Sequence, residues 1–205
     1  MSKKKPLIVF EGIESSGKTT LINYVSKNLK SKGIDFIKIR EPGGNFNSEL
    51  IRRLILNKKN TFNSFTDLML YFAARSENIE KIINKYYKKK IILIDRFTDS
   101  TVAYQHYGMG LDKFLINKIN KILLKKIKPT LIFLNIINMN NLSRRLKLRK
   151  NKNRYDNFKM KFYKKVQNGF LKISKNKSNY IIIDSNKNLI ENKKKVLKKI
   201  LKLIK

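Results

Sequence analysis

The chain has 205 residues, of which 41% are hydrophobic, so it is long enough for one domain with a sizeable core and too apolar for a disordered protein. Lysine and arginine total 48 against 14 acidic residues, a formal net charge of +34, and the absence of cysteine excludes disulfides, thiolate metal sites and cysteine nucleophiles. Such a charge is typical of proteins that bind polyanions, but 39 of the basic residues are lysine and only 9 are arginine. An AT-rich genome produces the same excess of lysine, asparagine and isoleucine. The few arginines therefore mark places where a planar, bidentate cation is needed.

No apolar run approaches the length of a membrane-spanning helix. The first one, residues 7–10, is also too short for the hydrophobic region of a signal peptide. We expect a soluble, cytoplasmic protein without a membrane partner.

Short apolar runs alternate with helical patterns along the whole chain. In chain order, the expected elements are a strand at 7–11, a helix from about 21 to 32, a strand at 34–39, helices at 46–56 and about 67–89, a strand at 91–95, a helix at 111–126, a strand at 131–134, helices at 138–148 and 158–173, a strand at 180–183 and a helix at 189–204. Four- to five-residue apolar strands between helices predict an α/β fold, with a five-stranded parallel sheet and helices on both faces. We expect one domain over residues 1–205.

The first turn between strand and helix carries a complete phosphate-loop motif. Its residues are Gly12, Ile13, Glu14, Ser15, Ser16, Gly17, Lys18 and Thr19. A strand before and a helix after the motif are the context in which backbone N–H groups wrap the phosphates of ATP. Lys18 would reach the β- and γ-phosphates, and Thr19 would bind Mg²⁺. We therefore expect ATP and Mg²⁺ as ligands.

Other features narrow the class of phosphate-loop protein. No Asn-Lys pair is followed two residues later by aspartate, so the guanine-binding motif of GTPases is missing. Large ATPase motors need a longer chain. A single small domain with several arginines far from the loop indicates a small-molecule kinase.

Five further segments resemble the thymidylate kinase family over nearly the whole chain. They are Arg40-Glu41-Pro42-Gly43-Gly44, Tyr71-Phe72-Ala73-Ala74-Arg75, Asp95-Arg96-Phe97, the segment 99–105 that contains Ala103-Tyr104-Gln105, and the basic segment around Arg149 and Arg154. Members of this family transfer the γ-phosphoryl group of ATP to dTMP, which gives dTDP for the dTTP supply of DNA synthesis. The resemblance also implies a P-loop kinase fold with a short lid, here at about 147–156, and a homodimer. The apolar helix face near residues 68–83 would permit such a dimer.

The resemblance implies a dTMP site. Arg40 would grip the dTMP phosphate, with Glu41 orienting it, and Glu14 would accept a hydrogen bond from the 3′-hydroxyl. Ser100 and Gln105 would approach the thymine edge, and Tyr104 would occupy the place of a 2′-hydroxyl.

Phe72 and Arg75 share one helix face, and the resemblance implies that they contact the thymine by stacking and by hydrogen bonding. An apolar stripe is usually core, and Phe72 alone fits that alternative. Arg75 on the same stripe favours a binding role, because a charge that faces a core needs a partner.

The resemblance further implies a set of catalytic cations. Arg96 would bridge the donor and acceptor phosphates, and Asp95 would bind a water ligand of Mg²⁺; alternatively, these two residues form a structural ion pair. The phosphate loop has no arginine, which is typical of the bacterial members, so Arg149 and Arg154 of the lid would close over the γ-phosphate together with Lys18. Transfer of this kind depends on positioning and on charge neutralisation.

Some positions depart from the family pattern. Met109 replaces an arginine, His106 a glycine, Asn135 an aspartate and Phe97 a tyrosine. None of these changes removes a central cation, so we expect an active enzyme. The alternatives are a monophosphate kinase for another base, an inactive relative and a nucleic-acid-binding ATPase. The last is disfavoured because the lysines are spread over almost every predicted helix instead of gathering among exposed aromatics, and we expect no nucleic-acid partner.

Overall fold

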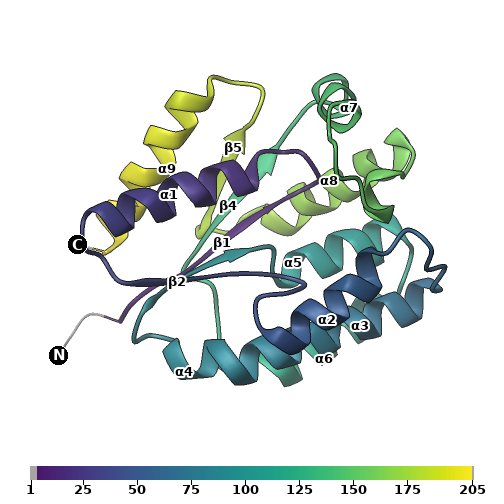
Figure 1. Ribbon diagram of the computed structural model, residues 1–205, viewed down its shortest axis with the longest axis horizontal. Coiled ribbons are helices and arrows are strands. Elements are labelled where there is room, and N and C mark those ends of the chain that lie inside the picture. Colours follow the sequence, from purple (N-terminus) through teal and green to yellow (C-terminus); the bar gives the residue numbers. More distant parts are fainter. Residues whose placement is uncertain (1–3, 205) are drawn as a thin grey trace.

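Five parallel strands form the centre of the molecule (Figure 1). The computed structural model describes residues 4–204, so both ends of the expected domain 1–205 lie outside the described residues. The strands are β1 (Leu7–Gly12), β2 (Phe36–Arg40), β3 (Ile91–Asp95), β4 (Leu131–Ile136) and β5 (Tyr180–Asp184). They lie in the order β2-β3-β1-β4-β5, and every neighbouring pair is parallel. The predicted α/β fold with a five-stranded parallel sheet is confirmed.

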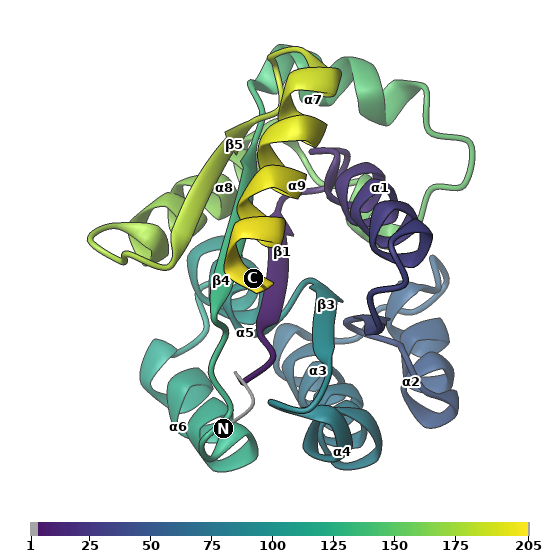
Figure 2. The same ribbon diagram turned by 90° about the vertical axis from the view of Figure 1, so that its left-hand side faces the viewer.

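Helices cover both faces of this sheet (Figure 2). They are α1 (Lys18–Ser31), α2 (Phe46–Leu56), α3 (Ser64–Asn78), η1 (Ile79–Ile83), α4 (Asn84–Tyr86), α5 (Thr98–Thr101), η2 (Val102–Gly108), α6 (Lys113–Leu124), α7 (Met139–Lys147), η3 (Arg154–Asp156), α8 (Met160–Ser174) and α9 (Leu189–Ile204). None of the helices in the described part of the chain is both long and apolar enough to cross a membrane.

Alternating side chains of the strands separate the core into two layers. Ile8 and Phe10 of β1 face α1 and α9, and pack against Val25 and Val196. Their neighbours in β1, such as Val9, face the opposite layer, which η1 and α6 cover. The strands are apolar on both faces because both are buried, which explains why they appear in the sequence as unbroken apolar runs.

Residues 98–108 form the helical segment α5–η2, for which the sequence pattern indicates no element. Its first residue follows Phe97, which offers no side-chain cap, so the local start signal is missing. Within the apolar face near residues 68–83, Leu68 and Ile83 are buried inside the chain, whereas Met69 and Ile82 are half-buried.

The carboxyl ends of β1, β3 and β4 meet at one edge of the sheet. β1 lies between the other two strands. After β1 the chain forms β2 and β3 on one side of it, and then crosses to form β4 and β5 on its other side. In open α/β sheets this reversal of strand order creates a crevice in which ligands bind. The crevice is bordered by Gly12, Asp95 and Asn135.

Candidate active site

The phosphate loop connects β1 to α1 at this crevice. Gly12 has φ +133°, and a Cβ atom there would lie 2.3 Å from the carbonyl oxygen of Asn135, so a side chain at this position would collide with β4. Gly17 has φ +89° and directly precedes α1. Both positions require glycine for the backbone to curl around an anion at the start of a helix.

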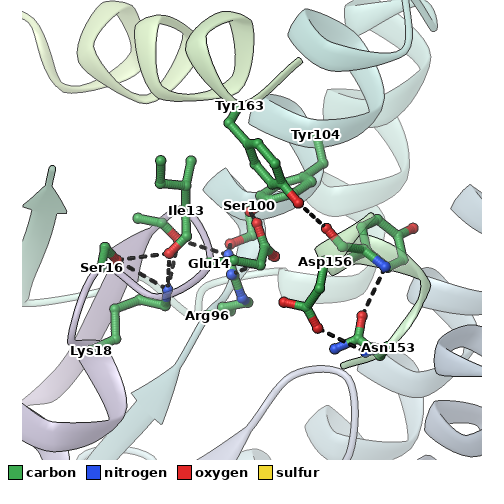
Figure 3. Close-up of polar contacts among 12 residues, drawn as sticks. Ile13, Glu14, Ser16, Lys18, Arg96, Ser100, Tyr104, Asn153, Asp156 and Tyr163 are labelled. Carbon is green, nitrogen blue, oxygen red and sulfur yellow. Dashed lines mark hydrogen bonds and ion pairs between the residues drawn. The ribbon is translucent and has the colours of Figure 1, made fainter. Parts of the chain in front are cut away.

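Lys18 is buried inside this loop (Figure 3). Its Nζ donates hydrogen bonds to the carbonyl oxygens of Gly12 at 2.8 Å and Ile13 at 2.7 Å. Burial, and next the positive charge of Arg96, lower the pKa of Lys18 to about 7. The ammonium group therefore lies in a place where a bound phosphate would stabilise its charge.

Thr19 and Asp95 meet at the end of the loop. The Thr19 hydroxyl donates to Asp95 Oδ2 at 2.9 Å, and this contact joins the first turn of α1 to the end of β3. No three histidine, cysteine, aspartate or glutamate side chains among residues 4–204 are arranged to hold a metal ion. A hydroxyl and one carboxylate fit a Mg²⁺ ion that takes most of its ligands from phosphates and water.

Arg96 reaches from β3 back to the phosphate loop. One terminal nitrogen donates to the carbonyl oxygen of Gly12 at 2.8 Å, and the other pairs with Glu14 at 2.9 Å. Glu14 also accepts the hydroxyl of Tyr104, whose ring lies 5.1 Å from the Arg96 guanidinium carbon (Figure 3). Arg96 thus pairs with Glu14, and not with its neighbour Asp95 as the alternative interpretation required.

Arg40 at the end of β2 lines the cleft, but Glu41 is not its partner as expected. Its guanidinium forms a bidentate pair with Glu49 of α2, with N–O distances of 3.1 and 2.8 Å. Glu41 is buried and instead accepts a hydrogen bond from Arg75 at 2.7 Å. Glu41 therefore does not orient Arg40, because its carboxylate pairs with Arg75.

Arg75 is buried and held by four hydrogen bonds. Besides Glu41, the acceptors are Asn120 Oδ1, the Phe97 carbonyl and Thr101 Oγ1, at 2.9 to 3.1 Å. Among residues 4–204, this arrangement leaves one N–H of the guanidinium without an acceptor. Arg75 lines a small hollow that opens beside the crevice.

The small hollow gathers most of the residues expected at the sugar and the thymine of dTMP. Glu14, Arg75, Ser100, Tyr104 and Gln105 all line it. The side-chain amide nitrogen of Gln105 is buried and has no hydrogen-bond acceptor in the described part of the chain, which is unusual for a polar group in a folded protein.

Phe72 has a different environment from these residues. It packs in an apolar cluster with Leu68, Val102 and Ile116, is 5% exposed, and does not line the hollow. Its ring centre lies 5.9 Å from the guanidinium carbon of Arg75.

The two lid arginines lie in different places. Arg149 forms an ion pair with Asp156 and lines the main cleft. Arg154 instead donates to the Ile55 carbonyl and pairs with the buried Asp67 of α3, away from the phosphate loop. In this structure only the first of them faces the phosphates' expected position.

These elements enclose a cleft of about 640 Å³. Seven basic residues line it, namely Lys18, Arg40, Arg52, Arg96, Arg145, Arg149 and Lys187. The motifs did not single out Arg52 or Arg145, although Arg52 donates to the Pro42 carbonyl and Arg145 to the carbonyls of Ser15 and Ser185. Because arginine is scarce in this chain, its presence at positions 52 and 145 was the one sequence signal for these two residues. So many cations around one cleft fit a ligand with several phosphates.

Comparisons with known proteins agree with this geometry. The thymidylate kinase family model matches residues 10–196. The thymidylate kinase of Sulfurihydrogenibium sp. (strain YO3AOP1) is 39% identical over 187 residues, which are 90% of this chain and 91% of the relative. The thymidylate kinase of Mycoplasma capricolum subsp. capricolum is 34% identical over 203 residues, which are 97% and 95% of the two chains. The crystal structure of thymidylate kinase from Ehrlichia chaffeensis aligns with a TM-score of 0.78 at 31% identity, over 97% of this chain and 99% of that one. The chain therefore belongs to the thymidylate kinase family and phosphorylates dTMP to dTDP with ATP.

Proposed function

We propose that the cleft holds both nucleotides at once, with ATP on the phosphate loop and dTMP on the side of Arg40 and the small hollow. The observation that carries this assignment is the position of Arg96, which lies between the loop at Gly12 and the hollow at Ser100. Two nucleotides bound on either side of this guanidinium would bring their phosphates together. The product dTDP would feed the dTTP supply for DNA synthesis.

On the donor side, the backbone of residues 12–19 would surround the β-phosphate, and Lys18 would leave the two loop carbonyls to bind the β- and γ-phosphates. Thr19 and Asp95 would hold Mg²⁺, because their oxygens already lie within hydrogen-bond distance of each other. When bound there, Mg²⁺ neutralises charge on the β- and γ-phosphates.

On the acceptor side, Arg40 would bind the dTMP phosphate, since its guanidinium is half exposed to the cleft and Glu49 fixes its orientation. The free N–H of Arg75 and the unpaired amide nitrogen of Gln105 supply donors for thymine carbonyls. Ser100 also lies at this edge of the hollow.

The remaining acceptor contacts concern the sugar and the face of the base. Glu14 would accept the 3′-hydroxyl, and Tyr104 would fill the space of a 2′-hydroxyl. Phe72 would contact the base only after a movement of its ring toward the hollow, because the ring is now covered by the cluster around Leu68.

In the transfer step, a phosphate oxygen of dTMP attacks the γ-phosphorus while the bond to the β–γ bridging oxygen breaks. The protein's part is to align the two phosphates and to neutralise their charge. Arg96 would bridge donor and acceptor, Lys18 would follow the γ-phosphoryl group, and Arg149 would close over it from the lid at 147–156. Arg154 would join them only if it leaves Asp67.

The function is tested by measuring ADP release with ATP, Mg²⁺ and a panel of monophosphates. We expect kcat/KM to be highest for dTMP, lower for dUMP and far lower for AMP and GMP, because the donors of Arg75 and Gln105 are proposed to bind thymine carbonyls that the purines do not present in the same places. Equal rates with AMP would contradict the acceptor site. ATP hydrolysis that nucleic acid stimulates without dTMP would instead favour the nucleic-acid-binding alternative.

The chain is also proposed to act as a homodimer that associates through α2. Phe46, Leu50 and Leu54 follow one another at intervals of four residues on this helix, and all three are exposed. This spacing forms one apolar stripe on the surface, which water disfavours unless a partner covers it.

Light scattering of the Leu50→Glu variant tests the dimer. We expect the mass to fall from dimer to monomer, because a charge in the middle of the stripe opposes its burial. Ile190→Glu on α9 introduces the same charge on another exposed apolar residue and should leave the mass unchanged. A dimer that persists in Leu50→Glu, or a monomeric parent protein, would contradict the assignment.

We further propose that residues 1–205 act as a single kinase domain in the cytoplasm. Its small phosphorylated substrates and its lack of cysteine are consistent with this compartment. Recovery of the protein in the soluble fraction of cells tests the location.

A further inference from the structure

Glu11 is a buried carboxylate to which the proposed mechanism gives no part. It lies near the end of β1, one residue before the phosphate loop, and lines neither the cleft nor the hollow. Its Oε1 accepts the backbone N–H groups of Phe97 at 2.9 Å and Ser100 at 3.3 Å. Its Oε2 accepts the hydroxyl of Ser100 at 2.6 Å. Glu11 thus holds three donors of one turn, the turn that follows Arg96.

The backbone of Arg96 is in an unfavourable conformation. Its φ of +68° lies in the left-handed region, which residues with a side chain avoid. Such a conformation persists where the surrounding structure fixes the chain on both sides. On the near side, the Arg96 N–H donates to the Phe10 carbonyl at 2.9 Å. On the far side, Glu11 supplies the fixed acceptors.

The turn has no local substitute for Glu11. Phe97 stands at the start of α5 and has no side chain that could cap the helix. Ser100 directs its hydroxyl to Glu11 and also accepts a hydrogen bond from Arg96 at 3.3 Å. The carboxylate is therefore linked to the guanidinium through the backbone and through this hydroxyl.

Burying a carboxylate here is energetically unfavourable. Burial, and next the nearby charge of Asp99, raise the pKa of Glu11 to about 7. A position in the central strand of a sheet would otherwise be filled by an apolar residue, as at Ile8 and Phe10. A carboxylate at this position is explained if its two oxygens are needed to hold the turn that follows Arg96.

We propose that Glu11 is a positioning residue, which holds the Phe97–Ser100 turn so that the Arg96 guanidinium stays between the phosphate loop and the acceptor hollow. This inference rests on the proposed bridging role of Arg96. Glu11 itself touches neither nucleotide in this arrangement. Its loss should therefore affect the transfer step more than the binding of ATP.

The test compares Glu11→Gln and Glu11→Ala with the parent enzyme. Glutamine keeps an oxygen for the two N–H groups but loses the acceptor for Ser100, so we expect kcat to fall about tenfold. Alanine leaves all three donors without Glu11, so we expect a fall of about 100-fold. In both variants the KM for ATP should change less than threefold. If Glu11→Ala does not fold, Glu11→Gln carries the test by itself.

Tyr87→Phe is a control for stability. It removes the hydroxyl that accepts the backbone N–H of Lys128 at 3.0 Å, and Tyr87 lies before the amino end of β3, at the opposite end of this strand from the turn that Glu11 holds. We expect a lower Tm with unchanged kcat. If the Glu11 variants behave in this way too, with a lower Tm but unchanged kcat, Glu11 is merely structural and the proposal is wrong.

A double-mutant cycle shows whether Glu11 acts through Arg96. In the Arg96→Lys background, Glu11→Gln should cause less than a twofold further loss of kcat, because the fork that it positions is gone. If Glu11→Gln lowers kcat by the same factor in the Arg96→Lys background as in the parent enzyme, the proposal is wrong. A failure of the proposed bridging role is a separate result: Arg96→Lys alone would then have the kcat of the parent enzyme.

Discussion

Replacement of Lys18 by methionine is expected to lower kcat/KM for ATP by about 10³-fold. The charge of Lys18 is the one positive charge placed inside the phosphate loop, and methionine keeps the length of the side chain without this charge. Burial disfavours the charged form of Lys18 and lowers its pKa to about 7. Because the buried charge is itself unfavourable for folding, its removal should change the Tm little. A low activity at a nearly unchanged Tm would therefore identify a role in phosphate binding and transfer.

Steady-state kinetics and a thermal melt check this result. Lys30→Met replaces an exposed lysine on the same helix α1 and should retain the parent activity. If Lys18→Met retained more than a tenth of the parent kcat/KM, the assignment of the ATP site to this loop would be wrong.

Arg149→Ala is expected to lower kcat by about 10³-fold with a much smaller change in the KM for ATP. Arg149 lines the cleft and pairs with Asp156, from which it can turn toward a γ-phosphate. A cation that reaches the phosphoryl group only during transfer stabilises the transition state more than the bound substrate. An effect confined to KM would contradict this role.

Two further lid variants complete the experiment. Lys150→Ala removes an exposed charge next to Arg149 and should leave kcat within threefold of the parent value. Arg154→Ala tests the second predicted catalytic arginine, which is paired with Asp67 in the structure. A kcat loss at unchanged Tm would support a role in transfer, whereas a lower Tm at unchanged kcat would assign Arg154 to holding the lid on α3.

Features that depend on neighbours in the chain could be predicted from the sequence. The helix at 46–56 has the predicted bounds because its cap, Asn45, and its apolar spacing are local. The phosphate loop was predicted in full for the same reason, since one strand, one glycine turn and one helix define it. The residues around it became candidates through the resemblance to a family.

Partnerships between distant residues could not be predicted in this way. Glu49 meets Arg40 only because α2 folds back over the end of β2, so no local pattern favours Glu49 over the adjacent Glu41 as the partner of Arg40. The helix that begins at Thr98 was missed because its acceptor, Glu11, comes from a strand more than 80 residues earlier in the chain.

The sequence alone determined the parallel sheet, the phosphate loop and the family of this protein, because short-range periodicity and motif spacing express backbone geometry directly. The tertiary structure decided which charges meet. It placed Arg149 in the cleft and Arg154 on Asp67, although both belong to one short lid segment. An ion pair forms where folding brings two side chains within a few ångströms, and that distance is a property of the packed chain.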